Sequence, residues 1–412
     1  MATEDEKNEP NIDIQQGTDG DTVTEVTQKS WLQRIGESFA GVVFGFVLIA
    51  GSCALLFWNE GRAVTTARSL SEGAGIVRSV SPEKLDTNND GKLVHVSGNL
   101  TPGGQATDPE FGMASSGVRL VRHVEMYQWT EESETSTKKE VGGSEKTTTT
   151  YKYTRAWKDK PVDSSKFKDR SGHNNPQMIY QSRVTLAPDI KLGVFETPDN
   201  LMRGFGTEEP MPAAQNHLAA LRRKLDKPVH AVDGKIYVGR EAGQPAVGDY
   251  RISFAEVPIQ PASIIARQAG INLEPYRTQA GGTVQLIAAG RVPAADMFQK
   301  AQADNSTLTW ILRAVGCVVM FVGFSMIMGP LGVLADVLPI LGDIVRAGTG
   351  LVAFLCTVAI APVVSAIAWL FYRPLVSIGI LAVGAGLTYG VIWLAKQRKA
   401  AKAAALPKAA PA

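Results

Sequence analysis

The hydrophobic residues of the chain gather in four long runs that contain no charged side chain. One run lies near the start of the chain, and three follow one another closely near its end. The runs are Phe39–Trp58, Ala314–Ala335, Ala347–Tyr372 and Pro374–Ala395. A helix needs about 20 apolar residues to cross the hydrocarbon core of a bilayer. Each run reaches this length, so the pattern predicts four transmembrane helices rather than buried helices of a soluble core.

The residues around these runs set the predicted segment boundaries. With their flanking residues, the transmembrane segments are 31–58, 310–335, 347–372 and 374–395. No basic stretch of signal-peptide type precedes the first run, so we expect a retained anchor. Only Arg373 separates the last two runs, which predicts an antiparallel hairpin. Residues 336–346 are short and amphipathic, and we expect an interfacial loop there.

The two ends of the chain carry opposite charge. Residues 1–30 are acidic, polar and poor in aromatic residues, which predicts a disordered tail, whereas residues 396–412 form a basic, alanine-rich tail. Four crossings would place both ends on one side of the membrane, and the basic tail favours the cytoplasmic side. Residues 59–309 would then face the periplasm of a prokaryote or a lumen in a eukaryote. The arginines that follow the first run argue the other way; they are Arg62, Arg68 and Arg78.

The region 59–309 alternates between apolar and polar positions, as β-strands do. The clearest strand is Val118–Trp129. On one of its faces lie His123, Glu125, Tyr127 and Trp129. Polar residues 130–150 follow, and a second alternating stretch begins at Tyr151. This arrangement predicts a long hairpin with facing aromatic residues and a mobile, exposed tip.

Further elements fill the rest of this region. Strands are expected at 93–100, 179–186, 229–238, 250–257, 262–267 and 283–288, and helices at 213–225 and 294–313, with the first transmembrane helix continuing to about Gly73. The predicted fold class is therefore an α+β membrane protein. It has four transmembrane helices and a β-rich extramembranous domain with a few helices. That domain is either one module or two β modules that divide near residue 205.

Composition narrows the classes of function. The formal net charge is +2, so no strong field points to nucleic acid. All three cysteines lie in apolar runs, so the β-rich region has neither a disulfide nor a cysteine-based zinc site. No ionisable residue lies at mid-depth in a predicted span, which argues against proton-coupled or charged-substrate transport.

Two stretches are candidates for chemistry. Asp86, Asn88 and Asp90 copy the opening of a calcium-binding loop, but its twelfth position is Ser97 rather than Glu, so a turn before a strand is the better interpretation. A metal or general-base site could also be built from residues of the clearest strand and one loop; these are His123, Glu125 and His173. No nucleophile elbow, phosphate-binding loop or dinucleotide fingerprint is found. We therefore assign no catalytic residue, no metal ligand and no cofactor.

Glycines at four-residue spacing mark two of the apolar runs. The pairs are Gly41 with Gly45 and Gly386 with Gly390. Small residues at this spacing let helix backbones approach closely in a membrane. The pattern predicts helix packing there, either within one chain or between chains.

Two longer motifs are specific enough to suggest a family. They are Arg122-His123-Val124-Glu125-Met126-Tyr127-Gln128-Trp129 and Trp369-Leu370-Phe371-Tyr372-Arg373-Pro374-Leu375. Shorter ones include Asn59-Glu60-Gly61-Arg62, Ser69–Gly73, Leu93-Val94-His95, Asp108-Pro109 with Phe111-Gly112, Gly172-His173 and Gly248-Asp249. In these motifs, which follow one another along nearly the whole chain, the sequence resembles the transmembrane protein 43 family, also called LUMA.

The resemblance implies a four-span protein of internal membranes. Animal members are associated with the endoplasmic reticulum and the inner nuclear membrane, where they are thought to oligomerise and to help organise envelope proteins such as emerin and lamins. The family has no established catalytic residues to carry over. Its motif positions here are Asn59, Glu60, Gly61, Arg62, His123, Glu125, Tyr127, Trp129, Arg373 and Pro374. In a prokaryote, which the Ala- and Gly-rich spans would also suit, only membrane organisation or sensing carries over.

Two functions follow from the sequence. We expect a non-enzymatic membrane scaffold whose partners are the lipid bilayer, further copies of itself and other membrane or envelope proteins, but not nucleic acid. The alternative is a membrane-bound enzyme or sensor that acts on lipid or cell-wall material. That alternative predicts that His123, Glu125 and His173 lie within a few ångströms of one another beside a cleft.

Overall fold

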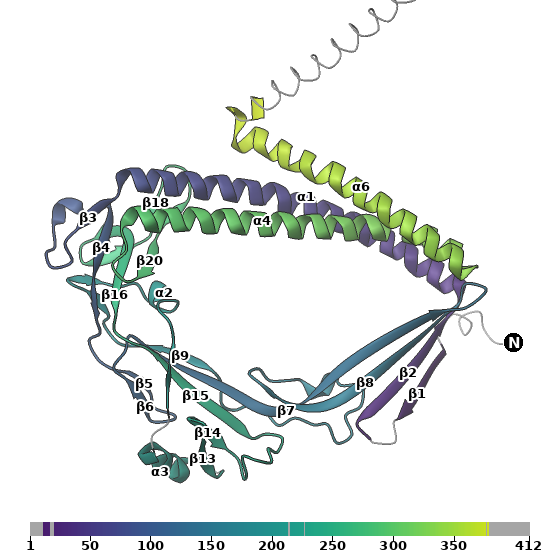
Figure 1. Ribbon diagram of the computed structural model, residues 1–412, viewed down its shortest axis with the longest axis horizontal. Helices are drawn as coiled ribbons and strands as arrows, with labels where there is room; N and C mark the ends of the chain where they lie inside the picture. The colour runs from purple at the N-terminus through teal and green to yellow at the C-terminus, as the bar shows by residue number, and fades with distance from the viewer. Residues whose placement is uncertain (1–10, 17–19, 213–214, 226, 376, 379–412) are drawn as a thin grey trace, which may run out of the picture. The chain divides into compact units, whose positions relative to one another are not determined.

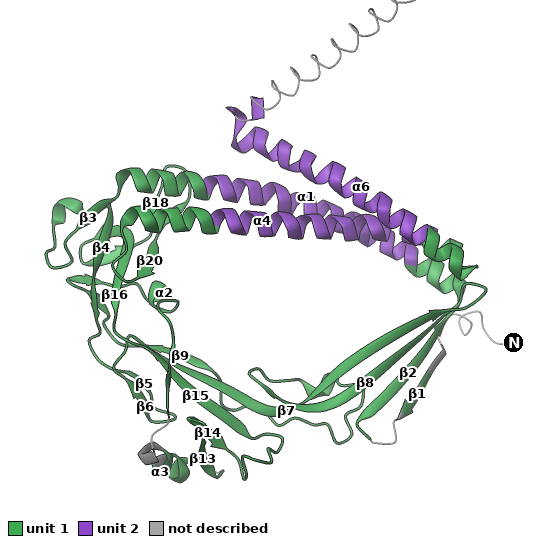
Figure 2. Cartoon of the chain, in the orientation of Figure 1, with its two compact units in different colours: residues 1–37, 66–304, 332–344 green, residues 38–65, 305–331, 345–412 purple. Residues whose placement is uncertain are grey.

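The chain divides into two compact units (Figure 2). The computed structural model describes residues 11–16, 20–212, 215–225, 227–375 and 377–378. Unit 1 takes its residues from 1–37, 66–304 and 332–344, and unit 2 from 38–65, 305–331 and 345–412. The described part of unit 1 is mostly β-sheet and that of unit 2 is helical (Figure 2). Figure 1 labels the helices and strands.

Three described helices are long and apolar enough to cross a membrane. They are α1 (Trp31–Ile76), α4 (Ala294–Ile327) and α6 (Pro339–Tyr372). α1 begins with a capping box, in which Ser30 Oγ accepts from the Gln33 amide at 3.3 Å and Gln33 Oε1 accepts from the Ser30 amide at 2.9 Å. The predicted fourth transmembrane helix, 374–395, lies almost entirely outside the described residues.

The connection between the second and third apolar runs differs from the prediction. α4 ends at Ile327, and a short helix, α5 (Gly329–Ala335), follows it. Residues 336–346 are not an interfacial loop, because α6 already begins at Pro339. Proline favours the first position of a helix, where its missing N–H costs nothing. Only residues 336–338 join the two helices.

Unit 1 contains two large sheets. The nine-stranded sheet has the order β1 (Asn11–Gln16), β2 (Thr22–Lys29), β8 (Glu145–Lys158), β7 (Arg119–Lys139), β15 (Tyr250–Val257), β14 (Lys235–Val238) and β13 (Val229–Val232), with β12 (Glu209–Met211) beside β15 and β9 (Arg183–Leu186) beside β7. The seven-stranded sheet has the order β20 (Leu286–Ala289), β16 (Pro261–Ala269), β17 (Asn272–Glu274), β11 (Phe195–Glu196), β10 (Lys191–Leu192), β4 (Leu93–Thr101) and β3 (Arg78–Val80). These sheets enclose the main hydrophobic core.

Smaller elements complete unit 1. Two strand pairs are β5 (Ala106–Asp108) with β6 (Met113–Ser115) and β18 (Tyr276–Arg277) with β19 (Thr283–Val284). Short helices are α2 (Asp199–Met202), α3 (Gln215–Lys224) and the 3₁₀ turns Thr87–Asn89 and Ser164–Lys166. α3 buries Leu218 and Leu221, as its apolar spacing predicts.

The division into two β modules near residue 205 is wrong. Each large sheet takes strands from both sides of that position: β7 pairs with β15, and β4 pairs with β16. The pairing partners lie far apart in sequence, so no local pattern of residues announces them. The two sheets, rather than two stretches of sequence, are the structural modules.

The long hairpin is formed by β7 and β8. Its register places Tyr127 opposite Trp157, and their ring centroids lie 5.1 Å apart. Along β7 the buried residues alternate with His123, Glu125, Tyr127 and Trp129, which are half-buried or exposed. The predicted period of two and the facing aromatic residues are both confirmed.

The described part of the N-terminal tail is ordered rather than disordered. β1 pairs with β2, and β2 pairs with β8 from Thr22 to Lys29. Val23 is buried with Tyr153 and Phe167 of the hairpin region. The β-branched residues of β2 suit a half-buried strand, and the threonine-rich β8 offers it a partner. The prediction of disorder was based on the polar composition of residues 1–30, and composition does not show how β-branched residues are spaced along a strand.

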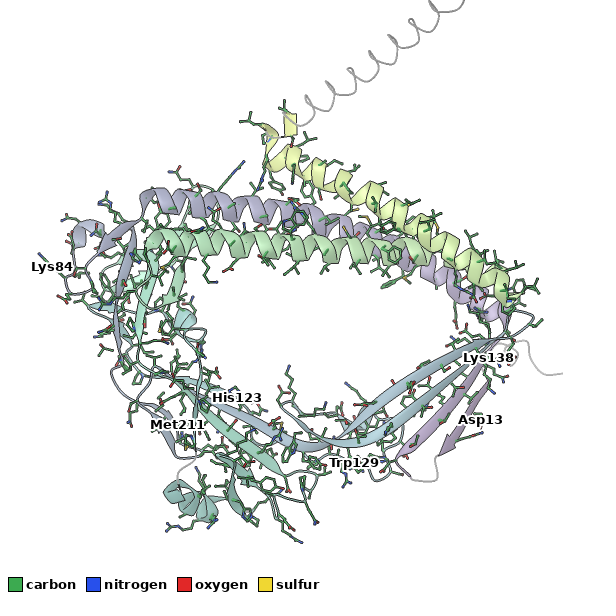
Figure 3. The ribbon with its side chains drawn as sticks, viewed as in Figure 1. Asp13, Lys84, His123, Trp129, Lys138 and Met211 are labelled. Atoms are coloured by element: carbon green, nitrogen blue, oxygen red, sulfur yellow. The ribbon has the colours of Figure 1, made fainter. Side chains whose placement is uncertain are left out.

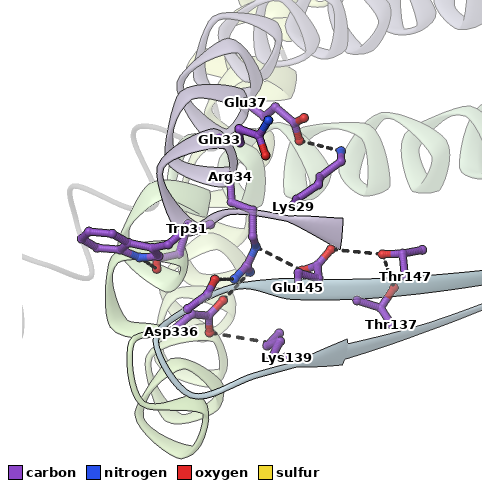
Figure 4. A network of polar contacts seen from close by, with 12 residues as sticks. Lys29, Trp31, Gln33, Arg34, Glu37, Thr137, Lys139, Glu145, Thr147 and Asp336 are labelled. Atoms are coloured by element: carbon purple, nitrogen blue, oxygen red, sulfur yellow. Dashed lines mark hydrogen bonds and ion pairs between the residues drawn. The ribbon is translucent and has the colours of Figure 1, made fainter. Parts of the chain in front are cut away.

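The tip of the hairpin is also held in place rather than mobile (Figure 4). Arg34, near the start of α1, donates to the carbonyl of Gly143 and to Asp336, each at 2.5 Å, and lies 3.2 Å from Glu145. The Gly142 amide donates to the carbonyl of Val337 at 3.1 Å. All these residues belong to unit 1. A buried arginine therefore fixes a tip whose composition suggested free movement.

The pairing of β2 with β8 conflicts with the predicted membrane topology. β2 precedes the apolar run of α1 and β8 follows it. A helix that crosses a bilayer once places its flanks in different aqueous compartments, whereas polar paired strands share one. A single crossing by α1 and the β2–β8 pairing exclude each other. Placement of β2 across the membrane from β8, as the predicted topology has it, is therefore wrong for this structure.

A disulfide across β2 and β8 tests this arrangement. Thr24 and Thr150 are cross-strand partners. In a chain whose native cysteines are replaced by alanine, we expect Thr24→Cys/Thr150→Cys to cross-link on mild oxidation in native membranes. Neighbouring strands bring Cα atoms into the range of about 4.4–6.8 Å that a disulfide needs. A shift in gel mobility measures the product.

The matched control for this cross-link is Thr24→Cys/Glu134→Cys. Glu134 faces Thr150 from β7, so it is two strands from Thr24, at about 9.6 Å, and beyond disulfide reach. If the first pair stays reduced and its cysteines label from opposite sides of sealed vesicles, the pairing is contradicted and a single crossing is restored.

Candidate functional site

The face of β7 that carries the first long motif is used for contacts within unit 1. His123 Nε2 lies 2.9 Å from Glu208 Oε2. Glu125 accepts two hydrogen bonds from Arg251, at 2.5 and 2.8 Å, and these bonds lower the pKa of Glu125. The Trp129 amide donates to Asn175 Oδ1 at 2.7 Å. The imidazole of His123, the carboxylate of Glu125 and the backbone amide of Trp129 thus each have a partner within unit 1.

The constellation that the enzyme alternative requires does not form. His173 is buried, stacks on Tyr153 at 4.1 Å and lies edge-on to Trp129 at 4.8 Å. Trp129 is six residues along β7 from His123, a distance of about 20 Å in a strand, and Figure 3 shows the two positions well apart. His123, Glu125 and His173 therefore do not converge.

The stretch that copies a calcium loop is a turn. Asp86 caps a 3₁₀ turn through Asn88, and Asp90 Oδ1 accepts from Gln268 and from the Gly270 amide. Among the described residues, no group of three or more His, Cys, Asp or Glu side chains is placed to hold a metal ion. The structure therefore supplies no geometric case for a metal centre in that part of the chain.

His95, from the Leu93-Val94-His95 motif, is a buried structural histidine. Its Nε2 lies 3.0 Å from the carbonyl of Val292, so this nitrogen carries the proton and donates. Its Nδ1 lies 3.2 Å from Ser79 Oγ and accepts from that hydroxyl. Burial lowers the pKa of His95, and the bond to Val292 opposes this effect in part. The neutral ring joins β4 to the segment that leads into α4.

The second long motif meets the Asn59-Glu60-Gly61-Arg62 motif in unit 2. Glu60 is 2% exposed and accepts from Arg313 at 2.6 and 2.9 Å. The indole of Trp369 donates to Glu60 at 2.8 Å. One carboxylate from α1 thus joins a guanidinium from α4 and an indole from α6. Charge-assisted, two-point bonds of this kind are among the strongest polar contacts in proteins.

Asn59 and Arg62, which flank Glu60 and Gly61 in the sequence, extend the contact between α1 and α4. Asn59 donates to the carbonyl of Thr309 at 3.1 Å. Arg62 donates to Asn305 Oδ1 and to Thr309 Oγ1, both at 2.9 Å. The polar residues of this motif therefore bind neighbouring helices and do not project into a cleft.

Gly61 has a separate, steric role. A Cβ at this position would lie 2.5 Å from Cζ of Tyr372. Tyr372 also packs on Phe57, with ring centroids 5.5 Å apart. Glycine at position 61 thus lets the tyrosine of α6 rest directly on α1.

The first predicted glycine pair lies where α1 and α4 approach. A Cβ on Gly45 would lie 2.7 Å from the carbonyl oxygen of Gly323, and one on Gly41 would lie 3.8 Å from Met326. This packing is within one chain. The second pair, Gly386 and Gly390, lies outside the described residues.

Arg373 differs from the other charged residues of unit 2. It lies near enough to Glu60 to interact with it electrostatically. No hydrogen bond or ion pair of its guanidinium is found among the described residues. Pro374, which follows it, is exposed. A guanidinium without a direct partner remains available to an outside ligand.

Sequence reasoning missed Arg313, Trp310, Asn305 and Thr309. Arg313 immediately precedes the apolar run that begins at Ala314, and none of the sequence patterns assigned it a role. The cation lies over the ring of Trp310, 4.7 Å from its centroid, three residues earlier. An Arg–Trp pair beside a long apolar run is the pattern that could have found it.

Three long apolar helices joined to a β-rich body define a membrane protein of the α+β class. The chain matches the family model described as Transmembrane protein 43 over residues 126–374. It therefore belongs to the transmembrane protein 43 family. No solved structure matches the chain.

Relatives support this membership along most of the chain. The Homo sapiens Transmembrane protein 43 is 33% identical over 393 residues, which is 91% of this chain and 94% of that protein. The Rattus norvegicus protein is 35% identical over 370 residues, with shares of 86% and 90%. A Transmembrane protein 43 homolog of Drosophila melanogaster is 31% identical over 355 residues, with shares of 83% and 92%.

A double-mutant cycle measures the Glu60–Arg313 pair. We expect Glu60→Ala to destabilise the detergent-purified chain by about 3–5 kcal/mol, because it leaves Arg313 without its partner. Glu60→Ala/Arg313→Ala should cost less than the sum of the two single changes. Thermal unfolding reports the difference. The exposed Lys300–Asp304 pair of α4 is the control, and Lys300→Ala should change stability by less than about 1 kcal/mol. Additive costs at Glu60 and Arg313 would show that the two residues are not coupled.

The steric role of Gly61 has its own test. We expect Gly61→Ala to destabilise the protein by about 1–3 kcal/mol, because the new methyl group meets the Tyr372 ring. Gly51→Ala in the same helix has open space around it and should be neutral or stabilising. Equal melting temperatures for the two variants would show that α6 does not rest on Gly61.

Proposed function

We propose that this protein is a non-enzymatic membrane scaffold that self-associates and organises membrane or envelope protein complexes. The carrying observation is the use of the family motifs. In unit 2, residues of the two motifs form hydrogen bonds that hold α1, α4 and α6 together. In unit 1, motif residues of β7 form hydrogen bonds with other residues of that unit. A protein whose motif residues fix its own architecture suits a supporting role better than a reactive one.

A cluster on unit 1 offers a surface for protein partners; three of its side chains are half-buried, and Tyr237 behind them is buried. Trp157 contacts Tyr127 at 5.1 Å and Tyr237 at 6.1 Å, and Arg251 lies over its ring at 4.8 Å. Tryptophan, tyrosine and arginine are the residues that dominate the binding energy of protein interfaces. The cluster is therefore the proposed place of contact with membrane or envelope proteins.

The proposed location is an internal membrane, by analogy with the family. In a eukaryote this would be the endoplasmic reticulum or the inner nuclear membrane, and in a prokaryote the inner membrane. The exposed apolar side chains of the three long helices support contact with lipid. They include Phe39, Phe46, Ile311, Val318, Phe354 and Phe371.

We propose that self-association uses the second glycine pair of the sequence pattern, which lies outside the described residues. Gly45 already faces Gly323 in the same chain, so it is not free to join two chains. Gly386 and Gly390 are the remaining pair from the sequence pattern. We propose that close helix approach at these two positions joins copies of the chain.

The mass of the protein in mild detergent tests self-association. We expect higher-order species of the wild-type chain and a shift to smaller ones for Gly386→Leu, because the larger side chain keeps helices apart. Gly51→Leu, in open space on α1, is the control and should leave the mass unchanged. Light scattering after size exclusion gives the mass. A monomeric wild-type chain in lipid nanodiscs as well as in detergent would remove the proposal.

A further inference from the structure

Unit 2 contains a groove with an apolar body and a cationic end. Its volume is about 540 Å³, within the range of about 300–1,000 Å³ typical of small-molecule sites. α1 contributes Leu56, α4 contributes Trp310, Arg313, Cys317, Val318 and Phe321, and α6 contributes Phe354, Thr357, Val358, Ala361, Pro362 and Ser365. Val318 and Val358 are more than half exposed, so the groove opens to the outside of the helices.

The apolar body suits a hydrocarbon chain but does not select one. Apart from Arg313, the thiol of Cys317 and the hydroxyls of Thr357 and Ser365, its wall is aliphatic or aromatic. Thr357 uses its hydroxyl on the carbonyl of Ala353 at 2.9 Å. In a bilayer, lipid tails are as apolar as such a wall, so burying one there gains packing and little hydrophobic energy. Any selectivity of the groove must come from its polar end.

The polar end carries an excess of positive charge. Beyond the lining residue Ser365, Trp369 lies four residues further along the same face of α6. Arg373 follows the last residue of α6, and its amide donates to the carbonyl of Trp369 at 2.7 Å. On α1, Glu60 lies one turn beyond Leu56. The carboxylate of Glu60 accepts hydrogen bonds from Arg313 and Trp369. Arg373 interacts with this carboxylate electrostatically, without a hydrogen bond. One carboxylate therefore faces two guanidinium groups, and one of these has no direct partner among the described residues.

We propose that this groove binds an anionic glycerophospholipid of the surrounding bilayer. One acyl chain lies along Phe321, Cys317 and Val358, and the headgroup phosphate lies at the end marked by Arg313 and Arg373. The phosphate supplies the negative charge that Arg373 lacks, and it accepts hydrogen bonds from the guanidinium group. The Trp310 and Trp369 rings suit the boundary between chain and headgroup, where amphipathic indoles concentrate. This inference goes beyond the scaffold role and does not depend on it.

The test compares lipids retained by the full-length protein. The wild-type chain is placed in nanodiscs of phosphatidylcholine with a minor share of phosphatidylglycerol, then released into mild detergent for native mass spectrometry. We expect retained phosphatidylglycerol in excess over its share of the nanodisc. Arg373→Gln should reduce this preference by about tenfold, the size of one lost charge-assisted bond. The Arg373 guanidinium group has no hydrogen-bond or ion-pair partner among the described residues. The melting temperature of the Arg373→Gln variant in lipid-free detergent should therefore stay close to that of the wild type.

Two matched variants separate the groove from general lipid contact. Val358→Trp fills the groove and should abolish retention of either lipid. Val363→Trp, on the same helix, has a similar exposed fraction (55% against 53%) but lies outside the groove, and it should retain phosphatidylglycerol like the wild type. Equal retention by both variants, or equal retention of the two lipids by the wild type, would overturn the proposal.

Two other occupants have distinct outcomes in the same experiments. Retention of a free fatty acid in place of phosphatidylglycerol would show that the cationic end reads a carboxylate and would contradict the phospholipid. The remaining occupant is the segment 374–395 of this chain. With Cys53 and Cys356 replaced by alanine, near-complete cross-linking of Cys317 to Ala385→Cys would place that segment in the groove and contradict a lipid there.

Discussion

The helical unit depends on one buried carboxylate. Glu60 is almost fully removed from solvent, and the loss of its hydration is compensated by a two-point bond from Arg313 and by the indole of Trp369. A charge so placed is costly unless it is both paired and hydrogen-bonded, and here it is both. Because its partners come from α4 and α6, the requirement that Glu60 be satisfied fixes which faces of the three helices meet. Gly61 and Tyr372 then set how closely they meet.

The motif residues that identify the family therefore mostly stabilise the fold. The motifs near positions 60 and 370 are far apart in sequence but bind each other: Trp369 donates a hydrogen bond to Glu60, and Tyr372 packs on Gly61. Within unit 1, Arg122 forms a buried ion pair with Asp108 at 2.9 Å and lies over the ring of Phe111, so three further motif residues stabilise one another. Arg373 stands apart, since it belongs to a specific motif but its guanidinium group makes no hydrogen bond or ion pair among the described residues.

The sequence predicted elements far better than their partners. Uninterrupted apolar runs located α1, α4 and α6, and the period of two located β7, β8, β15 and β16, because both signals are local. The pairing of β2 with β8, the joining of both halves of unit 1 in each sheet, and the bond from Arg34 to Asp336 are contacts between distant residues, and no local pattern encodes them. The polarity of residues 1–30 and 130–150 predicted a disordered tail and a mobile tip. In the described residues, however, β2 pairs with β8, and Arg34 binds the hairpin tip. For the candidate site, the sequence predicted the motif residues as a group without their contacts. It did not single out Arg313, since a charge just before an apolar run marks only the end of that run.

The ion pair at the hairpin tip differs in kind from those around it. Arg34 and Asp336 are almost completely shielded from water, whereas Asp343, which pairs with Lys139 at 3.1 Å, is well exposed. Dissolved ions weaken attraction between charges on a surface but scarcely reach a pair enclosed by protein. Added salt should therefore weaken the Lys139–Asp343 ion pair but leave the buried Arg34–Asp336 ion pair almost unchanged. The hairpin tip should therefore stay attached to α1 in compartments of different salt content.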